Sequence, residues 1–395
     1  RTVDLTASPI HRVLGLTTVL IGTGSTASSA DEKLELDALP RDHATALRIS
    51  LLQAAPAPVL ATDGAASPAQ GLAPEVVVAR FSARGLWYAP FSGTGQVAAG
   101  AVVGVAAQFA DSVRIDINED DLARIDTALV LTVALGVLLV AIVLAVGGYL
   151  VTNGGFTLAR QGNAWHVRRG LLTRRETSID VDRLAGISLG EQALLRVARG
   201  RRVHAIVTGL GKEQTGSTTL LPPAPHSVAS EVVRAVLGTD QPATGSLVAH
   251  GRRARTRRWS RALQTVTPPV LAAVVVVVLG GPVWLLALAA IAVVASLALA
   301  ADRIQAMGHG FLDGHVVMRS GSLTRTRDAL AARHVIGWNQ RATVFQRRAG
   351  LMTLAATTAG GHGKVAVYDV PDPAALVLAE AATPGLLGQF LEETG

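Results

Sequence analysis

The sequence predicts an α+β membrane protein in which small β-sheet domains, each closed by a C-terminal helix, are separated by α-helical transmembrane hairpins. Two observations predict this fold class: uncharged apolar stretches long enough to cross a bilayer, and soluble segments between them that resemble one another. Charged residues make up only 16% of the 395 residues and hydrophobic residues 49%, whereas ordinary soluble domains carry about 25% charged residues. This composition favours a membrane protein.

The apolar stretches supply four expected spans. Residues 127–150 are almost uninterruptedly apolar, and about 20 helical residues cross a bilayer core. A longer uncharged stretch is interrupted by glycine and proline at 280–282, which predicts two helices, 264–280 and 282–301. Residues 86–110 are rich in Gly and Ala and form the weakest span. The spans pair into two hairpins; buried helices of a soluble protein are the alternative, above all for 86–110.

Charge predicts the orientation of these hairpins. The loop at 111–126 holds six acidic residues and two arginines, whereas basic residues flank the outer ends of the spans. Lys and Arg beside spans stay in the cytoplasm, so we expect the larger soluble segments to lie inside a bacterial cell, at the inner membrane. The expected topology anchors are Arg80, Arg84, Arg252, Arg253, Arg255, Arg257, Arg258, Arg261 and Arg303.

The soluble segments repeat. RRGLLTRRE at 168–176 returns as RSGSLTRTR at 319–327, and the two copies align without a gap as far as Arg196 and Arg347. Each copy reads as strands that turn at a glycine, followed by one amphipathic helix. The opening residues supply half of a further copy, in which Val3 stands where Ile187 and Trp338 stand in its siblings. We therefore expect the chain to enter its first copy halfway through.

These patterns divide the chain into domains. The expected boundaries are the C-terminal half of domain 1 at 1–52, a hairpin at 86–110 and 127–150, domain 2 at 153–240, a basic linker at 241–261, a hairpin at 264–280 and 282–301, and domain 3 at 308–395.

At these residues the chain resembles the bacterial PH-like (YdbS-like or YdbT-like, DUF304) family, whose members carry short PH-like domains flanked by transmembrane hairpins. The resemblance rests on GFTLARQGNAWHVRRGLLTRRETSIDVDRLAGI at 155–187 and LLRVARGRRVHAIVTG at 194–209, directly after an apolar span. It is strong for the second copy, good for the first and weaker for the third. It implies PH-like barrels in a three-domain member with a truncated N-terminus, and it brings no catalytic motif.

The repeated basic turns are candidate contacts with lipid or the membrane surface. Three readings stay open: a specific lipid-headgroup site, general attraction to an anionic membrane at about 1 kcal/mol per basic residue, and plain solvation. In eukaryotic PH domains the turn between the first two strands holds phosphoinositide headgroups, and these turns are placed similarly. The candidate residues are Arg168, Arg169, Arg174, Arg175, Arg319, Arg325 and Arg327.

Other chemistry has little support in the sequence. The histidines are scattered without metal or triad spacing, and Asp180 and Asp182 suit a solvated face better than a metal pair. The run at 252–261 resembles a nucleic-acid patch, but it leads into a span and lacks the recognition aromatics that such a site needs. We therefore expect no enzyme activity, no catalytic residues, no cofactor, no metal and no nucleic-acid partner.

The function expected from these features is interaction. PH-like domains held at the cytoplasmic face would bind anionic lipid and a membrane or cytoplasmic protein, with a smaller PH-like membrane protein among the candidate partners. The alternative is an accessory subunit of an envelope-stress or export and transport complex.

Overall fold

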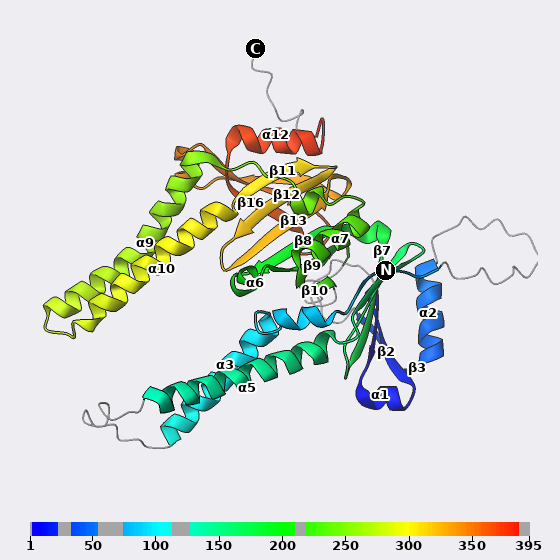
Figure 1. The fold of residues 1–395 in the computed structure, drawn as a ribbon. Helices are drawn as coiled ribbons and strands as arrows, with labels where there is room; N and C mark the ends of the chain where they lie inside the picture. Colours follow the sequence, from blue (N-terminus) through cyan, green and yellow to red (C-terminus); the bar gives the residue numbers. More distant parts are fainter. Residues whose placement is uncertain (1, 23–32, 54–73, 113–126, 210–217, 387–395) are drawn as a thin grey trace, which may run out of the picture. The chain divides into compact units, whose positions relative to one another are not determined.

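The computed structural model describes residues 2–22, 33–53, 74–112, 127–209 and 218–386 (Figure 1). The chain forms two compact units: unit one holds 1–183, 194–202 and 219–232, and unit two holds the remainder. The division falls inside the second repeat, so the segment expected as one domain at 153–240 contributes to both units. The acidic loop, from 113 onward, lies outside the described residues.

Unit one contains a seven-stranded antiparallel sheet in the order β3-β2-β1-β7-β6-β5-β4. Its strands are β1 (Thr2–Ala7), β2 (Leu16–Gly22), β3 (Lys33–Pro40), β4 (Val76–Arg80), β5 (Thr157–Gln161), β6 (Ala164–Arg169) and β7 (Arg174–Asp180). Strands from the first repeat and strands from the second therefore form one sheet, joined where β1 pairs with β7.

The alternating pattern of these strands places apolar side chains on one face, as a period of two requires. Leu5, Val19 and Ile21 are buried together with Ala44 of α2 (Arg41–Gln53). The short helix α1 (Pro9–Val13) connects β1 to β2 and is capped by Ser8, whose hydroxyl accepts from the His11 N–H at 3.2 Å.

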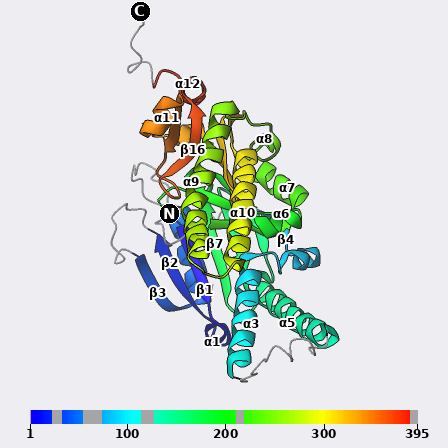
Figure 2. The ribbon, with the colours of Figure 1, turned by 90° about the vertical axis from the view of Figure 1, so that its left-hand side faces the viewer.

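Two long helices of unit one, α3 (Gly93–Ser112) and α5 (Thr127–Asn153), run side by side (Figures 1 and 2). The span expected at 86–110 differs from the structure, because 83–88 form a 3-10 turn and the helix begins only at Gly93. Ser92 caps that start by accepting from the Gly95 N–H at 3.3 Å.

Unit two contains the strands of the third repeat and part of the second. In one sheet β9, β8, β13, β12 and β11 follow one another, and a separate antiparallel sheet has the order β14-β15-β16. The strands are β8 (Leu184–Gln192), β9 (Gly200–Val207, in unit two from 203), β11 (Gly308–Leu312), β12 (His315–Gly321), β13 (Thr324–Ala331), β14 (Gly337–Arg341), β15 (Leu351–Thr357) and β16 (Lys364–Pro371).

Short helices and one further strand complete the pattern. They are α6 (Ala193–Val197), β10 (Thr219–Pro225), α7 (His226–Leu237), α8 (Gln241–Thr244), α11 (Val344–Arg348) and α12 (Asp372–Ala382), with 3-10 turns η3 (Val181–Arg183) and η5 (Ala332–His334). The order strand, short helix, strand, strand, helix recurs three times. Residues 384–386, after α12, form a turn.

The core of unit two is built mainly from the third repeat, with Ala185 and Ile206 of the second repeat. Val316, Met318 and Leu330 of the first sheet pack with Leu354 and Val367 of the second, and all five side chains are at most 1% exposed. Helix α12 covers one side of this core through its small residues and Leu378. Two antiparallel sheets packed face to face with a C-terminal helix are therefore present in unit two.

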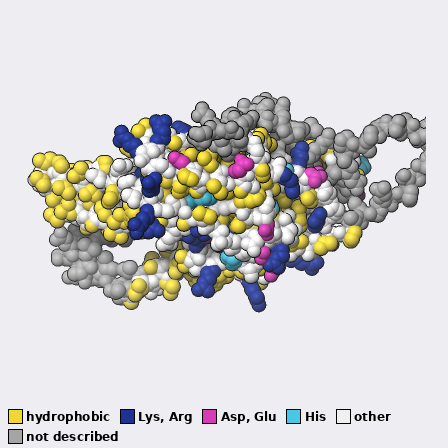
Figure 3. All heavy atoms as spheres, turned by 90° about the horizontal axis from the view of Figure 1, so that it is seen from above, with side chains coloured by type: hydrophobic (Ala, Val, Ile, Leu, Met, Phe, Trp, Pro, Cys, Tyr) yellow, Lys and Arg dark blue, Asp and Glu magenta, His cyan; other side chains and the backbone are white. Residues whose placement is uncertain are grey.

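The second hairpin consists of α9 (Gly251–Val278) and α10 (Trp284–Ala306) (Figures 1 and 2). The stretch expected as a basic linker differs, because from Gly251 onward it is the first part of α9. Arginine is a good helix former, so nothing in the run 252–261 breaks the helix before the apolar segment. Hydrophobic side chains cover the outer part of this arm, and basic side chains gather at its base (Figure 3).

Among the described residues, three helices are long and apolar enough to cross a membrane: Leu131–Asn153, Gly251–Val278 and Trp284–Ala306. Three of the four expected spans therefore have a matching helix. Helix α3 is not among the three, so its crossing of the membrane stays a prediction.

Candidate functional site

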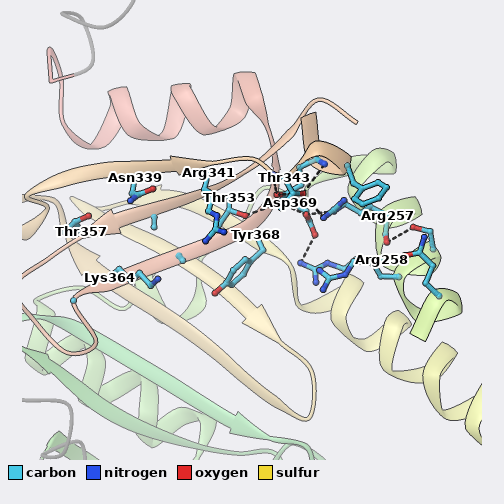
Figure 4. Close-up of a pocket in the computed structure, with 18 residues that line it drawn as sticks. Arg257, Arg258, Asn339, Arg341, Thr343, Thr353, Thr357, Lys364, Tyr368 and Asp369 are labelled. Atoms are coloured by element: carbon cyan, nitrogen blue, oxygen red, sulfur yellow. Dashed lines mark hydrogen bonds and ion pairs between the residues drawn. The ribbon is translucent and has the colours of Figure 1, made fainter. Parts of the chain in front are cut away.

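A basic pocket lies where α9 passes the outer face of the β14-β15-β16 sheet, within unit two. Its volume is about 970 Å³. The helix contributes Arg257, Arg258 and Arg261, and the strands contribute Arg341 and Lys364 together with polar side chains such as Asn339, Thr353 and Tyr368. Figure 4 shows Arg257 and Arg258 at one end of the pocket beside Asp369, with Arg341, Tyr368 and Lys364 on the strands.

The floor of the pocket is a buried carboxylate. Asp369 is only 1% exposed, and its Oδ1 accepts from Arg257 Nε at 2.9 Å and from Gln346 Nε2 at 2.9 Å. Arg258 Nη2 forms an ion pair with Asp369 Oδ2 at 2.8 Å. A carboxylate held by two guanidinium groups fixes α9 on β16, because charge-assisted hydrogen bonds are roughly twice as strong as neutral ones.

The local backbone serves this arrangement. Asp369 has φ +57°, a left-handed conformation that Asp and Asn adopt more readily than most residues. Gln346 forms a capping box with Thr343 at the start of α11, which holds its amide in place for Asp369. The strand and the short helix therefore hold the carboxylate in position for the arginines of α9.

Positive charge remains in excess in this pocket. Five of the side chains that line the pocket are cationic, and one lining side chain, that of Asp369, is acidic. Arg261, Arg341 and Lys364 are exposed, and no carboxylate pairs with them in the part of the chain that the structure describes. The pocket is therefore suited to an anion.

The pocket also lies next to the apolar part of the helix. After Arg261 no charged residue follows in α9, and α10 carries Asp302 and Arg303 in its last turns. Arg261, Asp302 and Arg303 therefore lie at the base of the hairpin, where the span would leave the hydrocarbon core, at the depth of lipid headgroups.

The first basic turn joins β6 to β7 at the end of α5. Gly170 N–H donates to the Gly154 carbonyl at 2.9 Å, and Leu171 N–H donates to the Val151 carbonyl at 3.0 Å. Gly170 has φ +101°, and a Cβ there would lie 2.0 Å from the Thr173 carbonyl oxygen. Glycine is therefore required at this turn.

The arginines of this turn differ in their surroundings. Arg168 donates to Glu176 at 3.1 Å and to Glu75 at 2.8 Å, and Arg48 bonds the same Glu176. Burial lowers the pKa of Arg168, but the carboxylates of Glu176 and Glu75 outweigh it and raise this pKa above its ordinary value. Burial raises the pKa of Glu176, but Arg48 and Arg168 outweigh it and lower this pKa. Arg169 is half-buried, and burial lowers its pKa.

Two arginines of the turn, Arg174 and Arg175, are exposed. Beside them at the tip, Leu171 and Leu172 are 48% and 55% exposed. Exposed leucines next to cations, at the end of a helix that could span a membrane, form a surface suited to a bilayer interface.

The second basic turn joins β12 to β13 and lies against the end of α10. Arg319 donates to the Ala306 carbonyl at 2.9 Å and to the Gln305 carbonyl at 3.0 Å. Arg325 pairs with Asp302 at 2.5 Å. These two cations thus satisfy groups at the C-terminal end of the helix, as cations there commonly do.

The third arginine of this turn is internal. Arg327 is buried and donates to the Pro242 carbonyl at 2.7 Å and the Gly245 carbonyl at 2.6 Å. Of the seven arginines predicted to meet lipid, the structure therefore leaves Arg174 and Arg175 exposed and gives protein partners to Arg168, Arg319, Arg325 and Arg327. The membrane role of these residues stays a prediction.

The predicted topology anchors separate into two groups. The first group is exposed at the ends of helices and strands and consists of Arg80, Arg84, Arg303 and, at the start of α9, Arg252, Arg253 and Arg255. Arg257, Arg258 and Arg261 line the pocket, a role that sequence reasoning missed. The spacing of these three arginines on one helix face was the available signal, but their acidic partner lies more than 100 residues away.

Within the described ranges, no group of three His, Asp or Glu side chains lies close enough together to hold a metal ion. His250 and His309 do lie near each other, with ring centroids 5.1 Å apart. Burial lowers the pKa of His250 to about 4 and lowers that of His309, so both rings are neutral near pH 7.

Comparison with known families identifies the module that carries the pocket. Residues 266–380 match the family described as the bacterial PH domain, a range that includes most of the second hairpin and the third repeat. No curated protein and no solved structure matches the chain. The chain thus contains a bacterial PH-like domain joined to helices long and apolar enough for a membrane. The match falls on the third repeat, where the sequence led us to expect a weaker resemblance than in the second.

Proposed function

We propose that the chain is a multi-pass protein of the bacterial inner membrane whose PH-like domains, on the cytoplasmic face, bind anionic lipid headgroups and a protein partner without catalysing a reaction. The single observation that supports this most is the uncompensated positive charge of the basic pocket, located where α9 becomes apolar. An anion at that depth is most simply the phosphate of a lipid headgroup.

The strength of such a site follows from its charges. Each basic residue near an anionic membrane surface contributes about 1 kcal/mol, which corresponds to about fivefold in affinity. Arg261, Arg341 and Lys364 have no carboxylate to neutralise them among the described residues, so they carry this attraction. Arg257 and Arg258 are committed to Asp369 and shape the pocket instead.

The experiment compares two triple variants of the full chain, purified in detergent and exposed to phosphatidylglycerol or phosphatidylcholine, with the retained lipids counted by native mass spectrometry. The test variant is Arg261→Gln, Arg341→Gln and Lys364→Gln. The control is Arg333→Gln, Arg347→Gln and Arg348→Gln, which removes equal charge from exposed residues that do not line the pocket.

We expect the test variant to bind phosphatidylglycerol roughly 100-fold more weakly, three charges at about 1 kcal/mol each, with no change for phosphatidylcholine. The control keeps its preference for the anionic lipid. Equal retention of phosphatidylglycerol by both variants would contradict the proposal.

The orientation is tested by labelling. The chain contains no cysteine, so Thr173→Cys in the first basic turn and Ser112→Cys at the end of α3 each introduce one thiol. In intact cells an impermeant maleimide should label the thiol at 112 and not the thiol at 173. The reverse pattern would place the PH-like domains outside.

A further inference from the structure

The strands of the repeats fall into a first group of three (β5–β7 and β11–β13) and a second group of three (β1–β3, β8–β10 and β14–β16). The first strand of a second group pairs with the third strand of the next repeat's first group in two places. β1 pairs with β7, where Val3 lies opposite Ser178. β8 pairs with β13, where Ile187 lies opposite Ala329. Both pairings are antiparallel, and because Val3 aligns with Ile187 and Ser178 with Ala329, the register is the same in the two.

The third strand of this kind is β14, in which Trp338 aligns with Val3 and Ile187. One side of β14 pairs with β15 from Gly337 to Arg341. On its other side no strand lies in the residues that the structure describes, since β14 ends its sheet. An edge strand presents a row of backbone N–H and C=O groups that can accept another strand.

Exposure shows the difference between the paired and the unpaired strands. Leu5 in β1 and Leu189 in β8 are 7% and 1% exposed. The residue in the same position of β14 is Gln340, which is exposed, as are Asn339 and Arg341. A polar edge keeps β14 soluble when it is free, as expected of a strand whose partner is a separate molecule.

We propose that β14 is a docking strand that takes, by antiparallel pairing, the third strand of a PH-like domain in a different polypeptide. This inference rests on the proposed function, because it specifies the protein partner. A second copy of this chain is the less suitable occupant, since its described strands of the required kind, β7 and β13, are already paired with β1 and β8.

The register also specifies the chemistry of the partner. In the β8–β13 pair, the Ser188 hydroxyl donates to Asp328 Oδ1 directly across the strands at 2.5 Å. Asn339 takes the position of Ser188, and its amide can donate to an acid or hydroxyl at the equivalent place. Arg341 lies two residues further along and favours an acidic residue opposite, as cross-strand pairs of opposite charge do.

Photocrosslinking in native membranes tests the docking strand. The full chain carries p-benzoylphenylalanine in place of Asn339, and the crosslinked peptides are sequenced by mass spectrometry. We expect a crosslink to another polypeptide, within the third strand of a bacterial PH-like domain and at the residue that the β1–β7 register places opposite. The same group in place of Arg348, exposed on α11, should not give this crosslink.

Two changes at Gln340, outside the basic pocket, give opposite expected results. Gln340→Leu restores the residue of β1 and β8 and should raise the crosslink yield about tenfold, because pairing buries the leucine. Gln340→Asp would bury an unpaired carboxylate and should lower it about tenfold. Thermal unfolding of both variants checks that the domain still folds.

Several outcomes would overturn the proposal: a crosslink between two copies of this chain, a crosslink only to lipid or to a protein without a PH-like domain, no crosslink, or equal yields from the two Gln340 variants. Phosphatidylglycerol retention is measured on the unsubstituted chain, because Asn339 lines the basic pocket. Retention that stays intact while the crosslink fails would refute the docking strand alone. Equal retention by the pocket variant and its control would refute the lipid site and leave the docking strand standing.

Discussion

Replacing Asp369 by asparagine tests how α9 is held on the PH-like domain. The change keeps the size of the side chain and suits its φ of +57°, since Asn tolerates the left-handed region as Asp does. It removes the charge that pairs with Arg257 and Arg258, whose side chains are 14% and 15% exposed against 2% for Asp369. The variant thus isolates the ion pairs from shape and backbone strain.

The expected loss is large because two guanidinium groups are left without their carboxylate. Removing one partner of a buried ion pair typically costs about 3–5 kcal/mol, and the slight exposure of the arginines places this site near 3 kcal/mol. Gln346 Nε2 donates to Asp369 Oδ1 at 2.9 Å and can still donate to the amide oxygen of the introduced asparagine. This one retained hydrogen bond offsets little of the loss.

The assay is urea unfolding of the full chain in detergent micelles, followed by pulse proteolysis of the third repeat. Asp313→Asn is the matched control: Asp313 also has positive φ, at +44°, and is exposed, with a hydrogen bond from Thr239 Oγ1 at 2.6 Å. We expect the control to lose less than about 1 kcal/mol. A loss for Asp369→Asn within about 1 kcal/mol of the control would refute the reasoning.

Two further predictions concern unit one. Gly170→Ala should cost about 3 kcal/mol in the free energy of unfolding, because φ is +101° and the new Cβ would meet the Thr173 carbonyl oxygen. The control Gly155→Ala, at φ +66° with no atom within 4 Å, should cost about 1 kcal/mol. Equal losses of stability in the two variants would contradict the steric argument. Burial lowers the pKa of His166 from 6.5 to about 4, so the unfolded chain binds the extra proton between these values and unit one should lose about 3 kcal/mol of stability as pH falls from 6.5 to 4. Urea titrations across this range should show a flatter dependence for His166→Gln, and an unchanged slope would refute the assignment.

The turns and three of the long apolar helices were predictable because their causes are local. An uncharged run such as 131–150 must be a helix if it crosses lipid, since only internal hydrogen bonds satisfy its backbone there. Gly170 and Gly321 marked both hairpin turns, and both have positive φ in the structure. The bacterial PH-like domain was expected from the resemblance to a known family and is supported by the match at 266–380.

The functional site was only partly predictable. The sequence shows the basic run at 252–261 but not that Arg257 and Arg258 meet Asp369, because that contact depends on how α9 packs on a strand far along the chain. Arg327 resembled Arg174 and Arg175 in a basic turn, yet it is buried against the Pro242 and Gly245 carbonyls. Burial of a cation depends on its tertiary neighbours and not on the motif that contains it.

By itself, the sequence determined the alternation of apolar helices with repeated β segments, because periodicity and charge act over a few residues. Only the tertiary structure decided that sheets join neighbouring repeats, with β1 on β7 and β8 on β13. Backbone hydrogen bonds between strands carry almost no sequence signature, so any exposed edge can in principle pair with any other. Which edges meet, and that β14 remains at the end of its sheet, depends on the packing of whole sheets and on the connections between them.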